Sequence, residues 1–223
     1  MKFGKLIVID GSDGSGKATQ TKLLVNKLKK DGVKVNTMDF PQYEKNFFGE
    51  FIGECLTGEY GNFLTLDPHI TSVLYAADRF ESSEKLKRWL NDGRIVILDR
   101  YVSANQIHQG GKIFEPIKRK KFLTWLEKLE YDIFKLPRPD KVIYLDVPVT
   151  TSVGLLQQSQ QKKQYQKDGK KDLVEQSMDY LKNARRSALW LSRNSKNWIR
   201  IECVKNGELR SIEDIHNDIY EIV

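Results

Sequence analysis

The stretch DGSDGSGKATQ, residues 10–20, constrains the chain more than any other part of the sequence. Gly11, Gly16 and Lys17 have the spacing G-x-x-x-x-G-K, in which backbone amides wrap around a phosphate and the lysine reaches its outer oxygens. A short apolar run, residues 6–9, precedes the stretch, and a helical pattern follows it. Such a loop works between a strand and the start of a helix, so the sequence predicts that arrangement and a phosphate-binding site.

The residue after the lysine departs from the usual form of this loop. A Ser or Thr there normally places its hydroxyl on a magnesium ion, but this chain has Ala18 and brings the hydroxyl one position later, at Thr19. Magnesium keeps several waters of its own, so the loop is still predicted to hold phosphate. Whether Thr19 contributes to the metal shell is left open. The predicted phosphate-binding residues are Gly11, Ser12, Gly14, Ser15, Gly16, Lys17, Ala18 and Thr19.

Short apolar runs alternate with helical patterns along the whole chain. This alternation is typical of an α/β fold, here of the P-loop NTPase type, with a five-stranded, mainly parallel sheet flanked by helices and a short lid. We expect one domain over residues 1–223. Strands are predicted at 4–10, 33–39, 94–99, 141–147 and 198–203, and helices at 17–31, 46–57, 67–92 and 115–136 and from Ser211 onward.

The net charge of +7 bears on the class of partner. A basic chain binds nucleic acid or anionic small molecules, but the basic clusters are short, and KRKK at 118–121 is interpreted as a solvated helix face. No motif of a nucleic-acid-binding fold accompanies it, so no nucleic-acid partner is expected. No apolar run approaches the ~18 residues of a membrane span, and the first one is too short for a signal peptide. A cytoplasmic protein without a membrane partner is therefore expected.

A second motif, ILDRYVSANQIHQGG, occupies residues 97–111 and begins in a buried-strand pattern. In open α/β sheets the ligand site lies at the carboxyl ends of the strands. Asp99, at the end of this strand, is therefore predicted to point toward the metal and the phosphates. Arg100 is suited to hold a phosphate through two parallel hydrogen bonds.

Further motifs surround these two in a defined order. Phe40-Pro41 follows the second strand pattern, LYAADR lies at 74–79, and DLVE lies at 172–175. Together with GKATQ and DRY, the set resembles the thymidylate kinase family, whose members move the terminal phosphate of ATP onto dTMP. The resemblance implies an ATP-dependent nucleoside monophosphate kinase that makes dTDP for dTTP synthesis, with Mg²⁺ as cofactor. It also implies a homodimer, formed through the regions 67–92 and 102–136.

The resemblance assigns a role to each catalytic candidate. Lys17 holds the ATP phosphates, and Arg100 holds the phosphate of dTMP. Asp13 lies near the sugar 3′-hydroxyl and the phosphate, and Asp99 meets the magnesium ion through water. The acceptor is already an anion, so no general base is expected.

A set of residues is implied to bind dTMP. Tyr75 and Arg79 are four positions apart and share a helix face; by resemblance, the ring stacks on thymine and the guanidinium donates to its O4. His108 replaces a tyrosine that relatives place near the sugar 2′ position, which leaves the selectivity for deoxynucleotides open. The full implied set is Asp13, Phe40, Tyr75, Arg79, Arg100, Asn105, His108 and Gln109.

The segment QQSQQKKQYQKDGKK, residues 157–171, is rich in Gln and Lys and has no apolar period. It is either a plain surface loop or a lid over about residues 157–172 that closes on a substrate. Thymidylate kinases place a catalytic arginine in the phosphate loop or in the lid, and this chain has neither. Arg185 and Arg186, on the helix that follows, are further candidates. The lysines considered as replacements are Lys162, Lys163, Lys170 and Lys171.

Two alternatives remain at this level. One is a related kinase that phosphorylates another nucleoside monophosphate or a deoxynucleoside. The other is a nucleotide-binding protein without kinase activity, whose basic faces bind nucleic acid.

Overall fold

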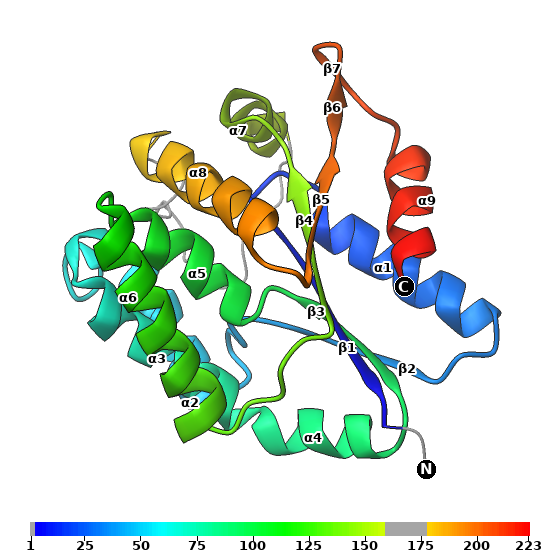
Figure 1. The fold of residues 1–223 in the computed structure, drawn as a ribbon, viewed down its shortest axis with the longest axis horizontal. Helices are drawn as coiled ribbons and strands as arrows, with labels where there is room; N and C mark the ends of the chain where they lie inside the picture. The colour runs from blue at the N-terminus through cyan, green and yellow to red at the C-terminus, as the bar shows by residue number, and fades with distance from the viewer. Residues whose placement is uncertain (1–2, 159–177) are drawn as a thin grey trace.

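The central element of the computed structural model, which describes residues 3–158 and 178–223, is a five-stranded sheet with the order β2-β3-β1-β4-β5. Every neighbouring pair in it is parallel. The predicted five-stranded α/β fold is therefore confirmed, and β1 lies in the middle with later strands on both sides (Figure 1). The strands are β1 Lys5–Gly11, β2 Val35–Asp39, β3 Ile95–Asp99, β4 Lys141–Asp146 and β5 Trp198–Glu202.

Helices cover both faces of the sheet, as near-continuous apolar strands require. Leu6 and Val8 point to one face and Ile7 and Ile9 to the other, because side chains alternate along a strand. The described helices are α1 Lys17–Lys30, α2 Phe47–Leu56, α3 Pro68–Glu81, α4 Ser83–Asn91, α5 Val102–Gly111, α6 Pro116–Glu127, α7 Val149–Gln158, α8 Met178–Asn194 and α9 Ile212–Ile222, with a 3-10 turn, η1 Phe63–Thr65, and a π-helical turn, η2 Lys128–Ile133.

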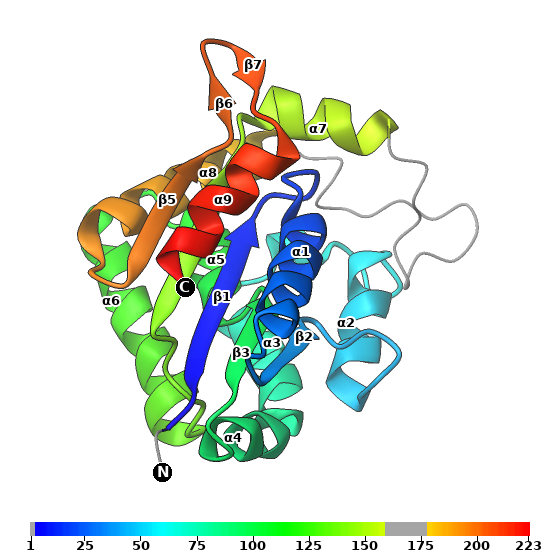
Figure 2. The same ribbon diagram turned by 90° about the vertical axis from the view of Figure 1, so that its right-hand side faces the viewer.

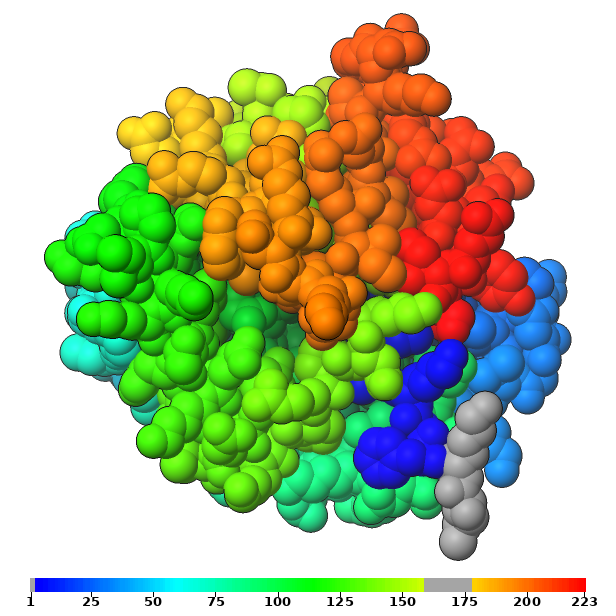
Figure 3. Space-filling view, in the orientation of Figure 1, coloured from blue at the N-terminus to red at the C-terminus, as the bar shows by residue number. Residues whose placement is uncertain are grey.

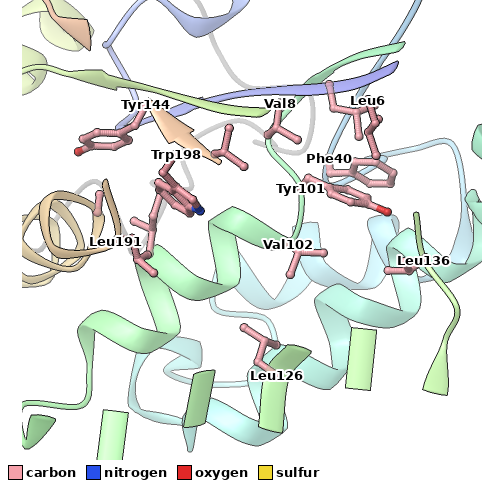
Figure 4. Close-up of a cluster of buried hydrophobic side chains, with 14 of the residues drawn as sticks. Leu6, Val8, Phe40, Tyr101, Val102, Leu126, Leu136, Tyr144, Leu191 and Trp198 are labelled. Carbon is pink, nitrogen blue, oxygen red and sulfur yellow. The ribbon is translucent and has the colours of Figure 1, made fainter. Parts of the chain in front are cut away.

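The two faces carry separate hydrophobic cores. Helices α4, α5, α6 and α8 pack on the face of Leu6 and Val8, with Tyr101 and Trp198 among the buried side chains (Figure 4). Helices α1 and α9 cover the opposite face (Figure 2). The phosphate loop leaves the end of β1 and enters α1, so it lies at the carboxyl edge of the sheet between these two layers.

Three local elements differ from the sequence prediction. The single helix predicted over 67–92 is wrong: the chain turns at Ser82 (φ −95°, ψ −2°) into a separate α4, which buries Leu86 and Leu90 under the sheet. The helix predicted over 115–136 widens into the π-helical turn η2, which contains the fully buried Glu130. A hairpin of β6 (Val204–Lys205) and β7 (Glu208–Leu209) was missed, although its Asn-Gly turn is a strong hairpin signal.

Two predicted helix starts are confirmed by their caps. The Asp67 carboxylate accepts from the His69 amide at 2.8 Å, and Pro68 occupies the first turn of α3. The Ser211 hydroxyl accepts from the Asp214 amide at 3.0 Å at the start of α9. Such caps satisfy amides that the helix itself leaves without partners. In the ranges 3–158 and 178–223, no helix is long and apolar enough to cross a membrane.

Asp78, a fully buried carboxylate on α3, should make the stability depend on pH. It accepts from the Gln42 amide at 3.1 Å and from Asn46 Nδ2 at 2.9 Å, and burial raises its pKa from 3.8 to about 6. The folded protein therefore binds more protons than the unfolded chain between pH 4 and 6, and the Asp78 contribution to the free energy of unfolding should fall by up to ~3 kcal/mol as pH rises through that window.

Urea unfolding of the wild type and Asp78→Asn at several pH values measures this contribution as a difference. The wild type should lose stability relative to the variant as pH rises from 4 to 6. Asp92→Asn, at an exposed position, is the control and should leave the slope unchanged. Parallel curves for the wild type and Asp78→Asn would show that the carboxylate does not titrate in this window.

Candidate active site

The loop between β1 and α1 has the geometry of an anion cradle. Gly14 (φ 79°) and Gly16 (φ 84°) adopt the left-handed conformation that glycine reaches without strain. Gly16 is the N-cap of α1, and no side chain caps that helix. The first amides of α1 are therefore available to an anion, whose charge the helix dipole also favours.

Lys17 is buried and folds back over the loop. Its Nζ donates to the Ser12 carbonyl at 2.9 Å and lies 3.5 Å from Asp13 Oδ1. Burial lowers the pKa of Lys17, and the nearby Arg100 lowers it further, whereas Asp13 and Asp99 act in the opposite direction. The ammonium group therefore lies against the backbone and side chains of the phosphate loop itself.

Arg100 reaches the same carboxylate from the end of β3. Its Nη2 donates to Asp13 Oδ1, and its Nη1 lies 3.0 Å from His108 Nε2. Burial opposes the charge of Arg100, but Asp13, Asp10 and Asp99 together raise its pKa. The backbone of Arg100 is left-handed (φ 64°), a strained conformation for a residue with a side chain. This bend turns the guanidinium back toward the phosphate loop.

Carboxylates gather at the carboxyl edge of the sheet. Asp99 is paired in register with Ile9 of β1 and with Asp39 of β2. Asp10 is fully buried and already engaged, because its oxygens accept from the Gly11 amide at 2.8 Å and the Ser103 hydroxyl at 2.5 Å. Burial raises the pKa of Asp99, although Lys17 and Arg100 counteract it, and no described residue donates a hydrogen bond to the Asp99 carboxylate.

This arrangement fits a magnesium ion that is held mainly by phosphates and water. Asp99 offers one carboxylate without a hydrogen-bond donor, and magnesium in phosphoryl-transfer sites typically takes one or two carboxylates. Among the described residues, no cluster of three His, Cys, Asp or Glu side chains can hold a metal. Ala18 and Thr19 are both exposed in the first turn of α1.

The predicted base-reading residues lie in a buried polar network. Arg79 is 1% exposed and forms a two-pronged ion pair with Glu130, with Nε 2.9 Å from Oε2, while its Nη1 donates to the Tyr101 carbonyl at 3.2 Å. Asn105 Nδ2 donates to Glu130 and to the Ser72 carbonyl, each at 3.1 Å. Arg79 and Asn105 are therefore brought together through a carboxylate that the sequence analysis did not select.

The position of Glu130 in the sequence indicates that its side chain is buried. It lies four residues after Leu126, which is buried on α6, and eight after Phe122, so a helical period places it on the apolar face. A carboxylate at such a position needs a buried cation as partner. Arg79, on the neighbouring helix α3, is the cation that pairs with Glu130.

The remaining predicted dTMP contacts differ in how open they are. Gln109 is 3% exposed, and its Oε1 is buried without a hydrogen-bond partner in the described structure. The Tyr75 ring packs 6.0 Å from Phe63. Phe40 is 4% exposed and packs 5.8 Å from the Tyr101 ring, so it mainly supports the wall of the site.

Arg185 and Arg186 do not enter this site. Arg185 Nε donates to Asp146 Oδ1 at 2.7 Å, and the Arg186 guanidinium lies 4.8 Å from the centre of the Phe114 ring. Neither contact involves a residue predicted for the site. The lid lysines, Lys162, Lys163, Lys170 and Lys171, lie outside the described residues, as does the Asp-x-x-Glu motif at 172–175.

Comparison with known proteins decides the family. The family model for thymidylate kinase matches residues 9–219. The chain belongs to the thymidylate kinase family. It is 30% identical to the Plasmodium falciparum thymidylate kinase over 100% of this chain and 90% of the relative. It is 34% identical to a probable thymidylate kinase of Thermococcus onnurineus over 97% and 96% of the two chains.

Two further thymidylate kinases show how far the likeness extends. The match to the Mycobacterium tuberculosis thymidylate kinase is 31% identical but spans 64% of this chain and 65% of the relative. The solved structure of the Candida albicans thymidylate kinase has a TM-score of 0.71 at 22% identity and covers 99% of this chain and 91% of the other. Membership in this family of phosphotransferases confirms the resemblance, the fold and the enzyme class predicted from the sequence.

The glycines of the thymidylate kinase loop should differ in their tolerance of a side chain. A Cβ at Gly14 would lie 2.3 Å from the Ser152 carbonyl oxygen of α7, whereas a Cβ at Gly16 meets nothing within 4 Å. Both alanine variants lose ~1–2 kcal/mol because of the left-handed backbone. Gly14→Ala should lose a further ~1–3 kcal/mol because the loop must move away from α7.

Urea unfolding of Gly14→Ala and Gly16→Ala, at one pH and without ligand, measures both losses. Gly16→Ala serves as the matched control because it shares the backbone conformation but not the close contact. Equal losses would contradict the view that packing against α7 is what requires glycine at position 14.

Proposed function

We propose that this protein transfers the terminal phosphoryl group of ATP to dTMP with Mg²⁺, and that the dTDP formed serves dTTP synthesis. The observation that carries the proposal is the Asp13 carboxylate, which is shared by Lys17 and Arg100. Lys17 belongs to the loop for the donor phosphates, and Arg100 is the predicted partner of the acceptor phosphate. One contact therefore links the two halves of a phosphoryl-transfer site.

The chemistry of phosphoryl transfer makes demands that these residues meet. The reaction needs two phosphates held in line and their charge stabilised, with little covalent work for the protein. In the proposal, the amides of the loop and Lys17 hold the ATP phosphates, and Arg100 orients the phosphate of dTMP. Asp13 keeps both cations in position before the substrates arrive, so their binding needs little rearrangement.

The magnesium ion, when bound, neutralises charge on the transferring phosphoryl group. Asp99 is the residue that would hold it, through a water ligand, and its place at the end of β3, in register with Ile9 of β1, puts this carboxylate near Lys17 and Asp13 of the phosphate loop. The lysines Lys162, Lys163, Lys170 and Lys171 are proposed from the sequence alone to supply further positive charge. A lysine supplies a point charge but lacks the planar fork of arginine.

The base pocket suits an uncharged pyrimidine. Glu130 neutralises Arg79, and three of the five guanidinium N–H groups have acceptors, so one of the other two can donate to a carbonyl oxygen such as O4 without adding net charge. Gln109 brings an Oε1 without a partner, which suits the N3–H of thymine. Tyr75 is proposed to stack on the ring, and Asn105, whose Nδ2 already donates twice, to contribute its carbonyl oxygen.

A homodimer remains part of the proposal. Helix α3, within the region 67–92, exposes Ile70 (58%), Val73 (40%) and Phe80 (50%). Exposed apolar side chains that gather on one element are typical of an interface. This surface supports association through the region predicted from the sequence.

The substrate preference tests the function directly. ATP consumption with Mg²⁺ should be fast with dTMP and slow with dUMP, UMP, dGMP, AMP or thymidine offered separately, because the pocket is proposed to read thymine and hold a phosphate. Chelation of the metal should abolish turnover. Equal rates with UMP would show that His108 does not exclude the 2′-hydroxyl, and phosphorylation of thymidine alone would replace the proposal by a deoxynucleoside kinase.

The role of Gln109 is tested by a pair of substitutions on one helix. Gln109→Leu should raise the KM for dTMP about tenfold to a hundredfold, because a buried hydrogen bond to the base is then unmade. The KM for ATP should not change. Gln106→Leu is the matched control, since Gln106 lies three residues earlier on α5 and lines a small cavity with Tyr131 and Trp198. If both variants keep the wild-type KM for dTMP, Gln109 does not read the base.

A further inference from the structure

A cavity of about 640 Å³ lies between α6, α7 and α8, and its lining shares no residue with the site described above. Figures 1 and 3 show α6 and α8 next to each other at one end of the molecule. Helix α7 separates the cavity from the phosphate loop, because Pro148 and Val149 line the cavity whereas Ser152 and Leu156 face Gly14. The volume falls in the range of small-molecule sites.

The cavity wall is strongly positive. Five cationic side chains line it, Arg119, Lys182, Arg185, Arg186 and Arg193, and none of its described lining residues carries a carboxylate. Arg185 is paired with Asp146 at 2.7 Å, and Lys182 lies 3.6 Å from Asp179. Within residues 3–158 and 178–223, no carboxylate forms an ion pair with the other three. Three guanidinium groups thus face one space without a counter-ion from the described chain.

Arg119 is the most constrained of these groups. It is 7% exposed, and its Nε is buried without a hydrogen-bond partner in the described structure. The KRKK cluster was interpreted as a solvated helix face, and this is wrong for Arg119, which turns inward while Lys118, Lys120 and Lys121 stay exposed. Burial lowers the pKa of Arg119, and Arg186 lowers it further. A buried cation without a neighbouring anion is unfavourable, so the surroundings of Arg119 are suited to bind an anionic ligand.

Aromatic side chains hold two of the guanidinium groups in place. Arg119 lies 4.6 Å from the centre of the Trp190 ring, and Arg186 lies 4.8 Å from that of Phe114. Stacking of this kind leaves the edges of the guanidinium free to donate, and these edges match the oxygens of a phosphate. Side chains fixed in advance lose less entropy when a ligand binds.

We propose that this cavity binds the di- or triphosphate group of a small anion, at a site separate from the phosphate loop. Several phosphates are inferred because three unpaired guanidinium groups match more than one negative charge. A small anion is favoured over a nucleic-acid backbone because the central cation, Arg119, is recessed among three helices. The proposal does not depend on the proposed kinase activity, since it rests on a different group of residues.

The experiment measures binding in a chain whose phosphate loop is weakened. Inorganic tripolyphosphate is titrated calorimetrically into Lys17→Met, and one binding site should remain. In Lys17→Met/Arg119→Met the affinity of this site should fall about tenfold or more, the usual effect of losing a charge-assisted contact. Methionine keeps the apolar stem that packs on Trp190. Lys17→Met/Lys120→Met removes the same charge at an exposed neighbour and should bind like Lys17→Met.

Thermal unfolding without any anion separates a ligand role from a structural one. Arg119→Met should unfold at the same temperature as the wild type or higher, because it removes an uncompensated buried charge. A lower unfolding temperature together with unchanged tripolyphosphate affinity would overturn the proposal and make Arg119 a packing residue. If the double variant does not fold, Arg193→Gln, on the exposed wall of the cavity, should weaken binding in the Lys17→Met background.

Two further ligands identify the source of the phosphates. Binding of ATP at this site with higher affinity than tripolyphosphate supports a free nucleotide, and the reverse order supports an inorganic polyphosphate. A single-stranded oligonucleotide whose binding depends on Arg119, with no binding of tripolyphosphate, overturns the small-anion proposal in favour of nucleic acid.

Discussion

The carboxylate of Asp13 is the contact on which the candidate active site depends. It accepts from Arg100, 87 positions away in the chain, and lies 3.5 Å from Lys17. The two cations would otherwise repel each other at the carboxyl edge of the sheet, and Arg100 does lower the pKa of Lys17. A shared anion at this point lets the fold hold both cations where two phosphates must meet. Two backbone features make this contact possible. Arg100 adopts a strained left-handed conformation, and the glycines of the loop adopt the same conformation without strain.

In the base pocket, too, a carboxylate holds a buried cation in place. Removing Arg79 and Glu130 from water is costly, and their mutual attraction offsets this cost only with good geometry and further hydrogen bonds. Both conditions are met, because the pair is two-pronged and the Tyr101 carbonyl and Asn105 complete it. Loss of either partner would leave a buried charge. The pair thus fixes the relative positions of α3, α5 and the π-helical turn, and with them the wall on which a base is proposed to lie.

Against this background the cavity between α6, α7 and α8 is an exception. In the active site and the base pocket, each buried cation has a carboxylate next to it, whereas Arg119 has none among the described residues. The compensated cations hold elements of the fold together. An uncompensated one, stacked on Trp190 and facing an open volume, has the character of a binding group instead.

The sequence by itself determined the strands, the phosphate loop, two helix starts and the family, because each depends on residues close together in the chain. Apolar runs of strand length and the spacing of Gly11, Gly16 and Lys17 are local signals that tertiary packing did not alter. The turn at Ser82, the pairing of Glu130 with Arg79 and the burial of Arg119 were decided by packing. Which carboxylate meets which cation was also decided there, because an ion pair is set by distances between elements remote in sequence, and the same residues at the same spacing are compatible with several partners.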